Sequence, residues 1–480
     1  MRKNFLSPIA IGLMTSMAIV TSSGVFADTS TQKQNYSSSS QITAQAALPQ
    51  LPFRSNLAYS TGVSAYIYGY TLVEMARTMQ KFEQTNELNT FKHDRNLADD
   101  KFRDFVKPNN DTLYSQSWLD LSKGPQVLSF PKINRYFTFQ FMDAYSNSFK
   151  YIGGSNKKEY KGGKYIIVGP DWKGKFPKGV NVIKSPTNMT WVLGRTLVDG
   201  EKDLTEVHKI QDSYKLAPLN RNQAKGSINI PTIQTNDYDD PIKFFNLMAQ
   251  LMKLNPAPQR DEALLSQLEF IDLDPVTGLF TGTADPVVLD GLTSAVKDGK
   301  EAIQKSLLVL QKPNNGNWTV NYDRVGTYGV YYLNRAMIAM NALGANIPKE
   351  AVYAITRKDS DGNTLSGQSK YVIHFDKNNL PPVNDFWSIC IYDSTNYFIA
   401  NPINRFSIGD RTEGLKYNID GSLDIYVQST APVGHESNWL PSPSSTTNTG
   451  FALLLRMYTP KESVQNNSYI IPSVKISSEQ

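Results

Sequence analysis

The sequence is short of cysteine. Cys390 is the only cysteine among 480 residues, so the chain cannot form an internal disulfide. It lies within the apolar run 386–392, a pattern typical of a buried strand. We therefore interpret Cys390 as a small core residue and not as a nucleophile.

Histidine is also scarce, and the short motifs of common enzymes are missing. The four histidines are scattered, without the close spacing that a histidine metal site favours. The sequence has no serine nucleophile elbow, zinc-protease motif, phosphate-binding loop or dinucleotide-binding fingerprint. We therefore expect no metal and no cofactor. A Ser-His-Asp triad stays open, because such triads assemble from distant positions.

The chain has no strong excess of charge of either sign. It carries 49 basic and 44 acidic residues, and two of the basic residues, Arg2 and Lys3, lie at the N-terminus. Without these two the net charge is about +3, which predicts binding neither to nucleic acid nor to an anionic membrane surface.

Long hydrophobic runs are absent as well. The apolar run Ile9–Val20 is short for a membrane span. Two basic residues precede it and a small-x-small site at 25–27 follows, which predicts a secretory signal peptide at 1–27, cleaved after Ala27. We expect an exported protein, periplasmic or secreted, with a short membrane anchor as the alternative. Residues 28–50 are rich in Ser, Thr, Gln and Ala and predict a disordered lead-in.

What the sequence does contain is the alternation typical of strands. Such patterns follow the turn formers at 108–112 and resume near 350, while the region between them has the apolar spacing of helices. We predict a mainly β protein with a helical insert, in which two jelly-roll-like antiparallel β-sandwich halves are linked by a helical middle segment. The predicted domains are an N-terminal helix plus β-sandwich half, a helical connector and a C-terminal β-sandwich half, at 51–220, 221–345 and 346–480.

Two Asp-Gly pairs predict hairpins in the second half. Asp361-Gly362 and Asp420-Gly421 each stand between two apolar runs. Asp-Gly in this setting is a strong signal for a tight turn between paired strands.

The two β-rich halves share an order of features. A strand ends in Asp143 in the first half and in Asp393 in the second. A Ser-Pro edge signal follows in both, and each half closes with an apolar strand that carries one arginine, Arg195 or Arg456. This common order predicts two related sandwiches.

An arginine inside an apolar strand needs a partner or a polar cavity, because an unpaired buried charge is unfavourable. One interpretation pairs Arg195 with Asp143, and Arg456 with Asp393 or Asp420. The other interpretation places both arginines on the wall of a ligand pocket. The sequence leaves both open.

Two further groups of residues are candidates for ligand binding. Asn109, Asp111 and Tyr114 stand at the start of the first strand, where they either build a turn or point into a pocket. Asn438 and Trp439 lie in a proline-rich loop and offer an amide and an aromatic plate for sugars or other flat polar ligands. A structural corner around a buried tryptophan is the alternative.

Carboxylate chemistry is the only catalysis that the sequence suggests. Asp143 and Asp393 are weak candidates for an acid and a base on a glycosidic or similar bond. The alternative is that these aspartates build turns and salt bridges.

Motifs in both halves resemble two bacterial families. The first half is similar to the domain of unknown function twelve fifty-four in Pro-Asn-x-Asp-Thr-Leu-Tyr-Ser at 108–115, Arg-Tyr at 135–136 and Trp-Val-Leu-Gly-Arg-Thr at 191–196. The second half resembles its usual partner, the domain of unknown function twelve fourteen, in Asn-Pro-x-Asn-Arg-Phe-Ser-Ile at 401–408, which contains Arg405, Asp-Gly-Ser at 420–422, Asn-Trp-Leu-Pro at 438–441 and Arg-Met-Tyr at 456–458. The resemblance implies jelly-roll-like halves joined by a helical part, often in exported proteins. It implies no agreed activity, so it assigns no catalytic residue.

We expect the protein to bind a polar small molecule or glycan in a cleft between the β halves. The alternatives are a hydrolase that uses paired aspartates, and a structural or assembly protein whose sandwiches pack into oligomers. The expected ligand-binding residues are Asn109, Asp111, Tyr114, Arg195, Arg405, Asn438, Trp439 and Arg456.

Overall fold

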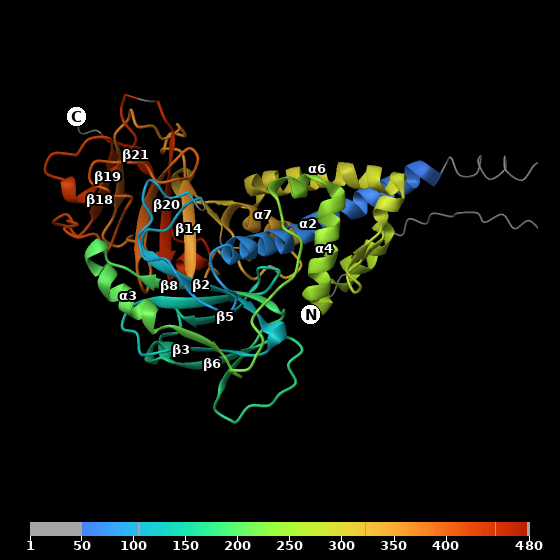
Figure 1. The fold of residues 1–480 in the computed structure, drawn as a ribbon. Helices are drawn as coiled ribbons and strands as arrows, with labels where there is room; N and C mark the ends of the chain where they lie inside the picture. The colour runs from blue at the N-terminus through green and yellow to red at the C-terminus, as the bar shows by residue number, and fades with distance from the viewer. Residues whose placement is uncertain (1–49, 104–105, 322, 447, 478–480) are drawn as a thin grey trace, which may run out of the picture. The chain divides into compact units, whose positions relative to one another are not determined.

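The structure is a computed structural model that describes residues 50–103, 106–321, 323–446 and 448–477 (Figure 1). The predicted signal peptide lies outside the described residues, as does the predicted lead-in except for its last residue. Across the described residues, no helix is both long and apolar enough to cross a membrane.

The N-lobe is the pair of sheets formed by strands between residues 92 and 218. The described strands are β1 (Lys92–His93), β2 (Thr112–Asp120), β3 (Gln126–Phe130), β4 (Phe137–Met142), β5 (Ser148–Gly153), β6 (Gly163–Val168), β7 (Asn181–Lys184), β8 (Met189–Leu197) and β9 (Lys215–Pro218). One sheet has the order β1-β2-β8-β4-β5 and the other the order β7-β6-β3-β9. The core between them is mostly aromatic, with Phe130, Phe137, Phe139, Phe141 and Tyr165.

The C-lobe is the second pair of sheets, formed by strands between residues 312 and 476. Its described strands are β12 (Lys312–Pro313), β13 (Thr319–Asn321), β14 (Ala351–Thr356), β15 (Tyr371–Phe375), β16 (Trp387–Asp393), β17 (Ser407–Gly409), β18 (Leu423–Gln428), β19 (Trp439–Pro441), β20 (Phe451–Tyr458) and β21 (Val474–Ile476). The sheet orders are β12-β13-β14-β20-β16-β17 and β19-β18-β15-β21. The core is mainly aliphatic, with Ile373, Ile389, Ile425, Leu453 and Leu455.

The two lobes repeat one topology. Strands β2 to β9 correspond in order to β14 to β21, so that β8 lies between β2 and β4 as β20 lies between β14 and β16. Even the parallel pairs correspond, because β6 pairs with β7 as β18 pairs with β19. A helix, α3 (Leu204–Ser213) or α8 (Glu462–Gln465), precedes the last strand of each lobe. The shared strand order confirms that the two sandwiches are related.

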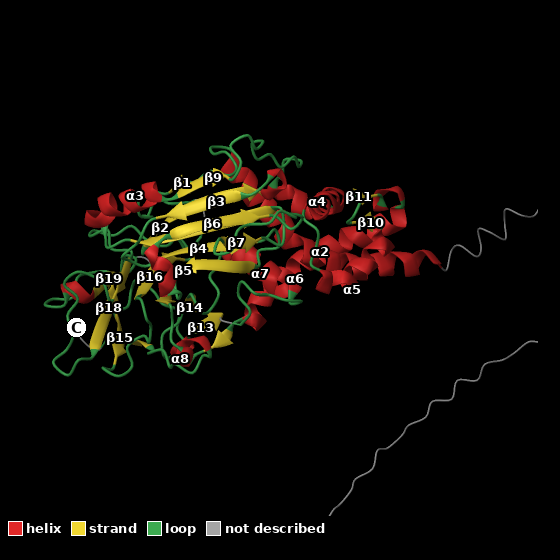
Figure 2. Ribbon diagram, turned by 90° about the horizontal axis from the view of Figure 1, so that it is seen from below, coloured by secondary structure: helices red, strands yellow, loops and turns green. Residues whose placement is uncertain are grey.

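The helical middle packs with the long N-terminal helix. The described helices are α2 (Gln50–Glu83), α4 (Pro241–Leu254), α5 (Glu262–Leu265), α6 (Pro286–Leu310) and α7 (Tyr332–Ala342), with a short pair of strands, β10 (Leu273–Asp274) and β11 (Leu279–Phe280). Figure 2 shows α2, α4, α5, α6 and α7 gathered together beside the strands.

Local sequence explains where these helices begin and how closely they approach. The Asp240 carboxylate caps α4 by accepting from two backbone N–H groups, and proline follows at the first helical position. Asp285 caps α6 by accepting from the Val287 N–H, again with proline at the first helical position. Gly291 of α6 faces α2, where an added Cβ would lie 2.4 Å from the Ser55 carbonyl oxygen. Glycine is therefore what lets the two helices approach this closely.

Both predicted Asp-Gly turns exist, and the first joins a short antiparallel pairing of Lys358 with Thr364. Contrary to the prediction, neither turn connects two paired strands of the sheets. Gly362 has a φ of +88° and donates its N–H to the Asp359 carbonyl, but β14 and β15 on either side belong to different sheets. The turn at Asp420-Gly421 follows a described segment without strand, between β17 and β18. In a sandwich, a tight turn can connect two layers as well as two paired strands, and the dipeptide does not distinguish the two cases.

Candidate functional site

A cavity of about 190 Å³ lies where both lobes meet the helices. The N-lobe contributes β2 and β8, the C-lobe β13, β14 and β20, and the helical part the ends of α6 and α7. Its polar lining includes Lys107, Asn109, Tyr114, Arg195, Tyr353, Arg456 and Tyr458. Much of the remaining lining is apolar and includes Leu307, Val325, Met337, Ile338, Leu343, Ile355 and Leu454.

Arg195 enters this cavity from β8. Val192 of the same strand faces the sandwich core. Arg195 follows it by three residues, and residues an odd number apart on a strand point to opposite faces, so Arg195 points to the outer face of the sheet. Its guanidinium donates to Gln140 Oε1 at 2.8 Å, Asn346 Oδ1 at 3.1 Å and the Gly344 carbonyl oxygen at 2.7 Å. The predicted pairing with Asp143 is therefore wrong, because amide and carbonyl groups satisfy the arginine without neutralising its charge.

Arg456 enters from β20 in the corresponding way. It donates to the Lys107 and Pro108 carbonyl oxygens at 2.8 and 3.2 Å and to Tyr392 Oη at 2.9 Å. The predicted pairing with Asp393 or Asp420 is wrong as well. Both arginines are about 95% buried, yet both lie on the outer faces of their sheets and not inside the sandwiches.

The two arginines hold the lobes together reciprocally. Arg195 of the N-lobe binds the segment that leads into β14, and Arg456 of the C-lobe binds the segment that leads into β2. Each also lies opposite a tyrosine of the adjacent strand, since Arg195 pairs with Tyr114 and Arg456 with Tyr353. The same arrangement therefore occurs twice around one cavity.

The cavity lining is positively charged. Lys107, Arg195 and Arg456 line it, and no Asp or Glu is among the described lining residues. None of these cations has a carboxylate oxygen within 4 Å among the residues that the structure describes. Burial lowers the pKa of Lys107, and the nearby Arg357 and Arg456 lower it further. Three cationic groups without an ion-pair partner among the described residues are an unfavourable arrangement in a partly buried site.

Asn109 and Asp111 build a turn at the edge of the cavity. Asn109 Oδ1 accepts from the Asp111 N–H at 2.7 Å, and its amide donates to Thr112 Oγ1 and Tyr458 Oη. Tyr114 lines the cavity and lies under Arg195, with 5.6 Å between its ring centroid and Cζ. Asn109 therefore builds a turn and also lines the cavity, the two roles that the sequence left open.

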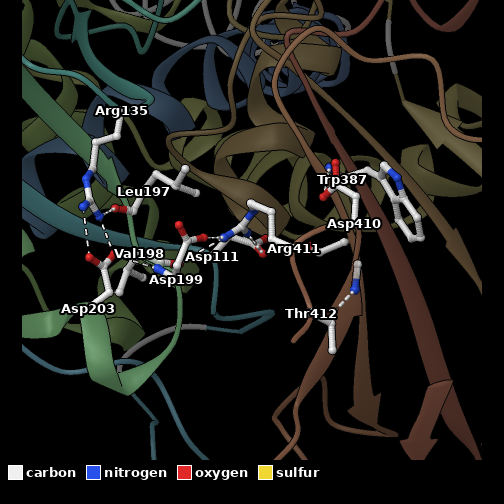
Figure 3. A network of polar contacts seen from close by, with 12 residues as sticks. Asp111, Arg135, Leu197, Val198, Asp199, Asp203, Trp387, Asp410, Arg411 and Thr412 are labelled. Atoms are coloured by element: carbon white, nitrogen blue, oxygen red, sulfur yellow. Dashed lines mark hydrogen bonds and ion pairs between the residues drawn. The ribbon is translucent and has the colours of Figure 1, made fainter. Parts of the chain in front are cut away.

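Asp111 belongs to a polar network that joins the lobes beside the cavity (Figure 3). Its carboxylate accepts from Arg411 Nη2 at 2.9 Å and from Ser388 Oγ at 2.6 Å, both in the C-lobe. Arg411 also donates to Asp199 at 2.6 Å, and Arg135 binds Asp203 nearby. Asp111 is thus neutralised by Arg411 and acts as a link between the lobes.

Three other candidates lie in a separate corner of the C-lobe. Arg405 donates to the carbonyl oxygens of Glu436, Ser437 and Trp439. Asn438 bonds the Lys416 backbone, and the buried indole of Trp439 donates to the Gln428 carbonyl at 2.7 Å. None of these three residues lies at the cavity. Their contacts are those of a structural corner around a buried tryptophan, which was the alternative interpretation.

Asp143 and Asp393 both build turns. Asp143 accepts from the backbone N–H groups of Tyr145 and Asn147, and Asp393 from those of Thr395 and Tyr397. The two aspartates occupy equivalent positions. Asp143 follows Thr138, the partner of Arg195 on β4, by five residues, and Asp393 follows Ser388, the partner of Arg456 on β16, by five residues. Burial raises the pKa of Asp143. Their contacts are those of turn formers and give no support to a catalytic pair.

Sequence reasoning missed Lys107, Tyr353 and Tyr458. Tyr353 had a detectable signal, because the proposed duplication of Arg195 and Arg456 also implies an equivalent of Tyr114. Lys107 carries no such signal, since it is one of many lysines. No group of three or more His, Cys, Asp or Glu within the described part of the chain is placed to hold a metal ion.

Two family models match the chain. Residues 88–218 match Protein of unknown function (DUF1254), and residues 350–462 match Protein of unknown function (DUF1214). The chain combines these two domains in this order. The DUF1254 match contains β2 to β9 and the DUF1214 match contains β14 to β20. Both domains and the segment between them therefore line the cavity.

A solved structure with this fold exists. The VPA0106 protein from Vibrio parahaemolyticus has a TM-score of 0.69 and 23% sequence identity, over 88% of this chain and 100% of that protein. This likeness shows the fold alone. An uncharacterized protein from Burkholderia cenocepacia has 11% identity and a TM-score of 0.42, over 91% and 98% of the two chains. No curated protein matches the chain.

Proposed function

We propose that the protein binds a small organic anion in the cavity between its two β lobes. The observation that carries this proposal is the lining charge: Lys107, Arg195 and Arg456 surround the cavity without a lining carboxylate. An anionic ligand would supply the missing counter-charge. Hydrogen bonds between guanidinium and carboxylate groups are also among the strongest in proteins.

The rest of the lining indicates that the anion carries an apolar body. Aliphatic side chains of α6, α7, β14 and β20 form much of the wall, and Tyr114 and Tyr353 add aromatic surface. Known ligand pockets of roughly 300–1,000 Å³ hold drug-sized molecules, so a cavity of about 190 Å³ favours a smaller one. This combination favours a carboxylic acid with a short aliphatic or aromatic body over an inorganic ion.

The alternatives fit the site less well. A neutral glycan would leave all three cationic groups without a counter-charge. A hydrolase that uses Asp143 and Asp393 would need carboxylates that are free to exchange protons, and both are bound to turn N–H groups. Both alternatives therefore lack the support that the lining charge gives to an anion.

Melting temperatures with hexanoate and benzoate as probes test the proposal. A ligand that binds only the folded state stabilises it by about 2.7 kcal/mol at a hundredfold excess over its Kd. We expect both anions, but not hexanamide or benzamide, to raise the melting temperature. Arg195→Met and Arg456→Met should each reduce this shift.

The variants need controls, because both arginines also hold the lobes together. Lys107→Met is the informative companion, since the Lys107 side chain makes no hydrogen bond or ion pair with any other described residue. Arg221→Met, at an exposed position, should leave the response unchanged. Anions that shift wild type and Lys107→Met equally, or that shift nothing, contradict the proposal.

Export is a separate proposal that the N-terminal sequence supports. A basic start, a short apolar run and a small-x-small site precede Asp28. Mass spectrometry of the intact protein from cytoplasmic, periplasmic and culture fractions tests it. We expect an exported chain that begins at Asp28, and a full-length cytoplasmic chain would contradict the proposal.

A further inference from the structure

The duplication places equivalent groups on two walls of the cavity. On the N-lobe wall, Arg195 of β8 lies opposite Tyr114 of β2. On the C-lobe wall, Arg456 of β20 lies opposite Tyr353 of β14. Since β8 and β20, and likewise β2 and β14, occupy the same positions in their sheets, the cavity has two related cationic walls and not a single one.

The two arginines are held by separate sets of partners. They share no hydrogen-bond partner: Arg195 binds Gln140, Gly344 and Asn346, whereas Arg456 binds the 107–108 segment together with Cys390 and Tyr392. Apolar side chains such as Leu343 and Leu454 complete the wall. The lining therefore carries one arginine on each lobe, with apolar side chains over much of the remaining wall.

Each guanidinium retains capacity for a ligand. A guanidinium has five N–H donors. The hydrogen bonds of Arg195 use three of them and those of Arg456 use four. All acceptors are uncharged groups, so the guanidinium on each wall makes no ion pair with a described carboxylate. One negative charge on the ligand could balance only one of the two.

We propose that the ligand is an organic dianion, such as a dicarboxylate, with one acidic group toward Arg195, the other toward Arg456, and an apolar middle. This inference rests on the proposed function and specifies the ligand class. Lys107 makes the two ends unequal, because it adds a second cationic group beside Arg456. The acidic group on the C-lobe side therefore meets two cations and that on the N-lobe side meets one.

Calorimetric titration with matched probes tests the number of acidic groups. The probes are the dicarboxylates from succinate to suberate, together with terephthalate. The matched controls are adipic acid monoamide, which has the length of adipate and one acidic group, and hexanoate. We expect the best dicarboxylate to bind about tenfold to a hundredfold more tightly than its monoamide, as one added charged hydrogen-bond pair implies.

Single substitutions then locate the two acidic groups. In Arg195→Met and in Arg456→Met, the best dicarboxylate should bind no more tightly than the monoamide binds wild type. Arg195→Lys and Arg456→Lys keep the charge and should retain part of the advantage, which separates charge from loss of the interlobe contacts. Arg221→Met should retain all of it.

The outcomes separate this inference from the proposed function. Binding of the monoamide and the dicarboxylates with equal affinity overturns the dianion and leaves the anion site standing. Binding of none of the acids overturns both. A dicarboxylate advantage that survives in Arg195→Met or in Arg456→Met overturns the two-wall arrangement.

Discussion

The N-lobe and the C-lobe share a strand order but not a core. Phe139 and Gly194 face each other across β4 and β8 in the N-lobe. The equivalent positions on β16 and β20 hold Ile389 and Leu455. A large residue opposite a glycine has thus been exchanged for two residues of intermediate size. The topology depends on where apolar residues stand and tolerates a change in which residues they are.

The outer faces of the same strands differ less. Each carries one arginine opposite one tyrosine, and each arginine holds the segment that leads into the other lobe. What the lobes have in common beyond their strand order therefore faces the cavity and not the sandwich cores. This contrast is the reason to look for function between the lobes.

The largest expected effect comes from emptying each core at equivalent positions. Phe139→Ala should lower the free energy of unfolding by about 3–5 kcal/mol, and Ile389→Ala by about 2–5 kcal/mol. The loss should be greater at Phe139, because Gly194 opposite has no side chain to fill the space, whereas Leu455 does. Urea unfolding of both variants measures the difference. A smaller loss at Phe139 than at Ile389 contradicts this account of the cores.

Acid should act on the N-lobe through His93. Burial and the nearby Arg95 lower the pKa of His93 to about 4, from an ordinary value of 6.5. The unfolded chain therefore binds more protons than the folded one between these values. The stability that this group contributes is greatest above pH 6.5 and is lost as the pH drops to about 4.

The C-lobe supplies the matched substitution for this test. Ser115 of β2 and Ala354 of β14 are equivalent positions. His93 is the strand partner of Ser115 and Val320 is the strand partner of Ala354, so valine is the C-lobe equivalent of His93. His93→Val should therefore flatten the loss of stability between pH 6.5 and 4. Unfolding midpoints across this range give the measurement, and an unchanged slope in the variant assigns the acid sensitivity elsewhere.

The equivalent turn aspartates should differ in importance. Asp143 is buried and accepts from two backbone N–H groups and the Asn147 amide. Asp143→Ala leaves these donors without a partner and should lower stability by about 1–3 kcal/mol. Asp393→Ala, at a more exposed turn, should lower it less. Thermal unfolding measures both losses. Equal losses of stability in the two variants would contradict the expectation that the more buried aspartate contributes more.

The smallest expected effect comes from giving the N-lobe core the pair of residues found at the equivalent positions of the C-lobe core. An added Cβ at Gly194 would lie 2.9 Å from the Phe139 ring and 2.8 Å from the Ser115 carbonyl oxygen. Gly194→Leu alone should therefore be destabilising. Adding Phe139→Ile, which gives the N-lobe the C-lobe pair, should recover part of the loss, with a coupling of about 1 kcal/mol in a double-mutant cycle. Strict additivity would show that the pair does not share its space.

The sequence predicted the two β lobes, the helical middle and the relation between the lobes, because apolar alternation and the order of Asp143, Arg195, Asp393 and Arg456 are visible in it. It did not predict what the arginines bind. Their partners are backbone carbonyl groups and uncharged side chains from distant parts of the chain, and no residue pattern indicates such partners. Ion pairing was the reasonable expectation from side chains alone, and tertiary structure replaced it.

The corner around Trp439 shows a second limit. Tryptophan, asparagine and arginine serve equally in ligand sites and in buried corners, and only the partner atoms separate the two. In the structure these partners are the carbonyl oxygens of the same loop and of Gln428. Lys107 is the opposite case. Nothing in the sequence marks this lysine, and it becomes a candidate for ligand binding only through its position beside Arg456 in the structure.

A crystal structure of the protein with adipate tests the central claim most directly. The account predicts adipate in the cavity between the lobes, with a carboxylate oxygen about 2.7–2.9 Å from a guanidinium nitrogen of Arg195 or Arg456. Adipate bound elsewhere, or a cavity that contains only water at saturating adipate, would contradict it.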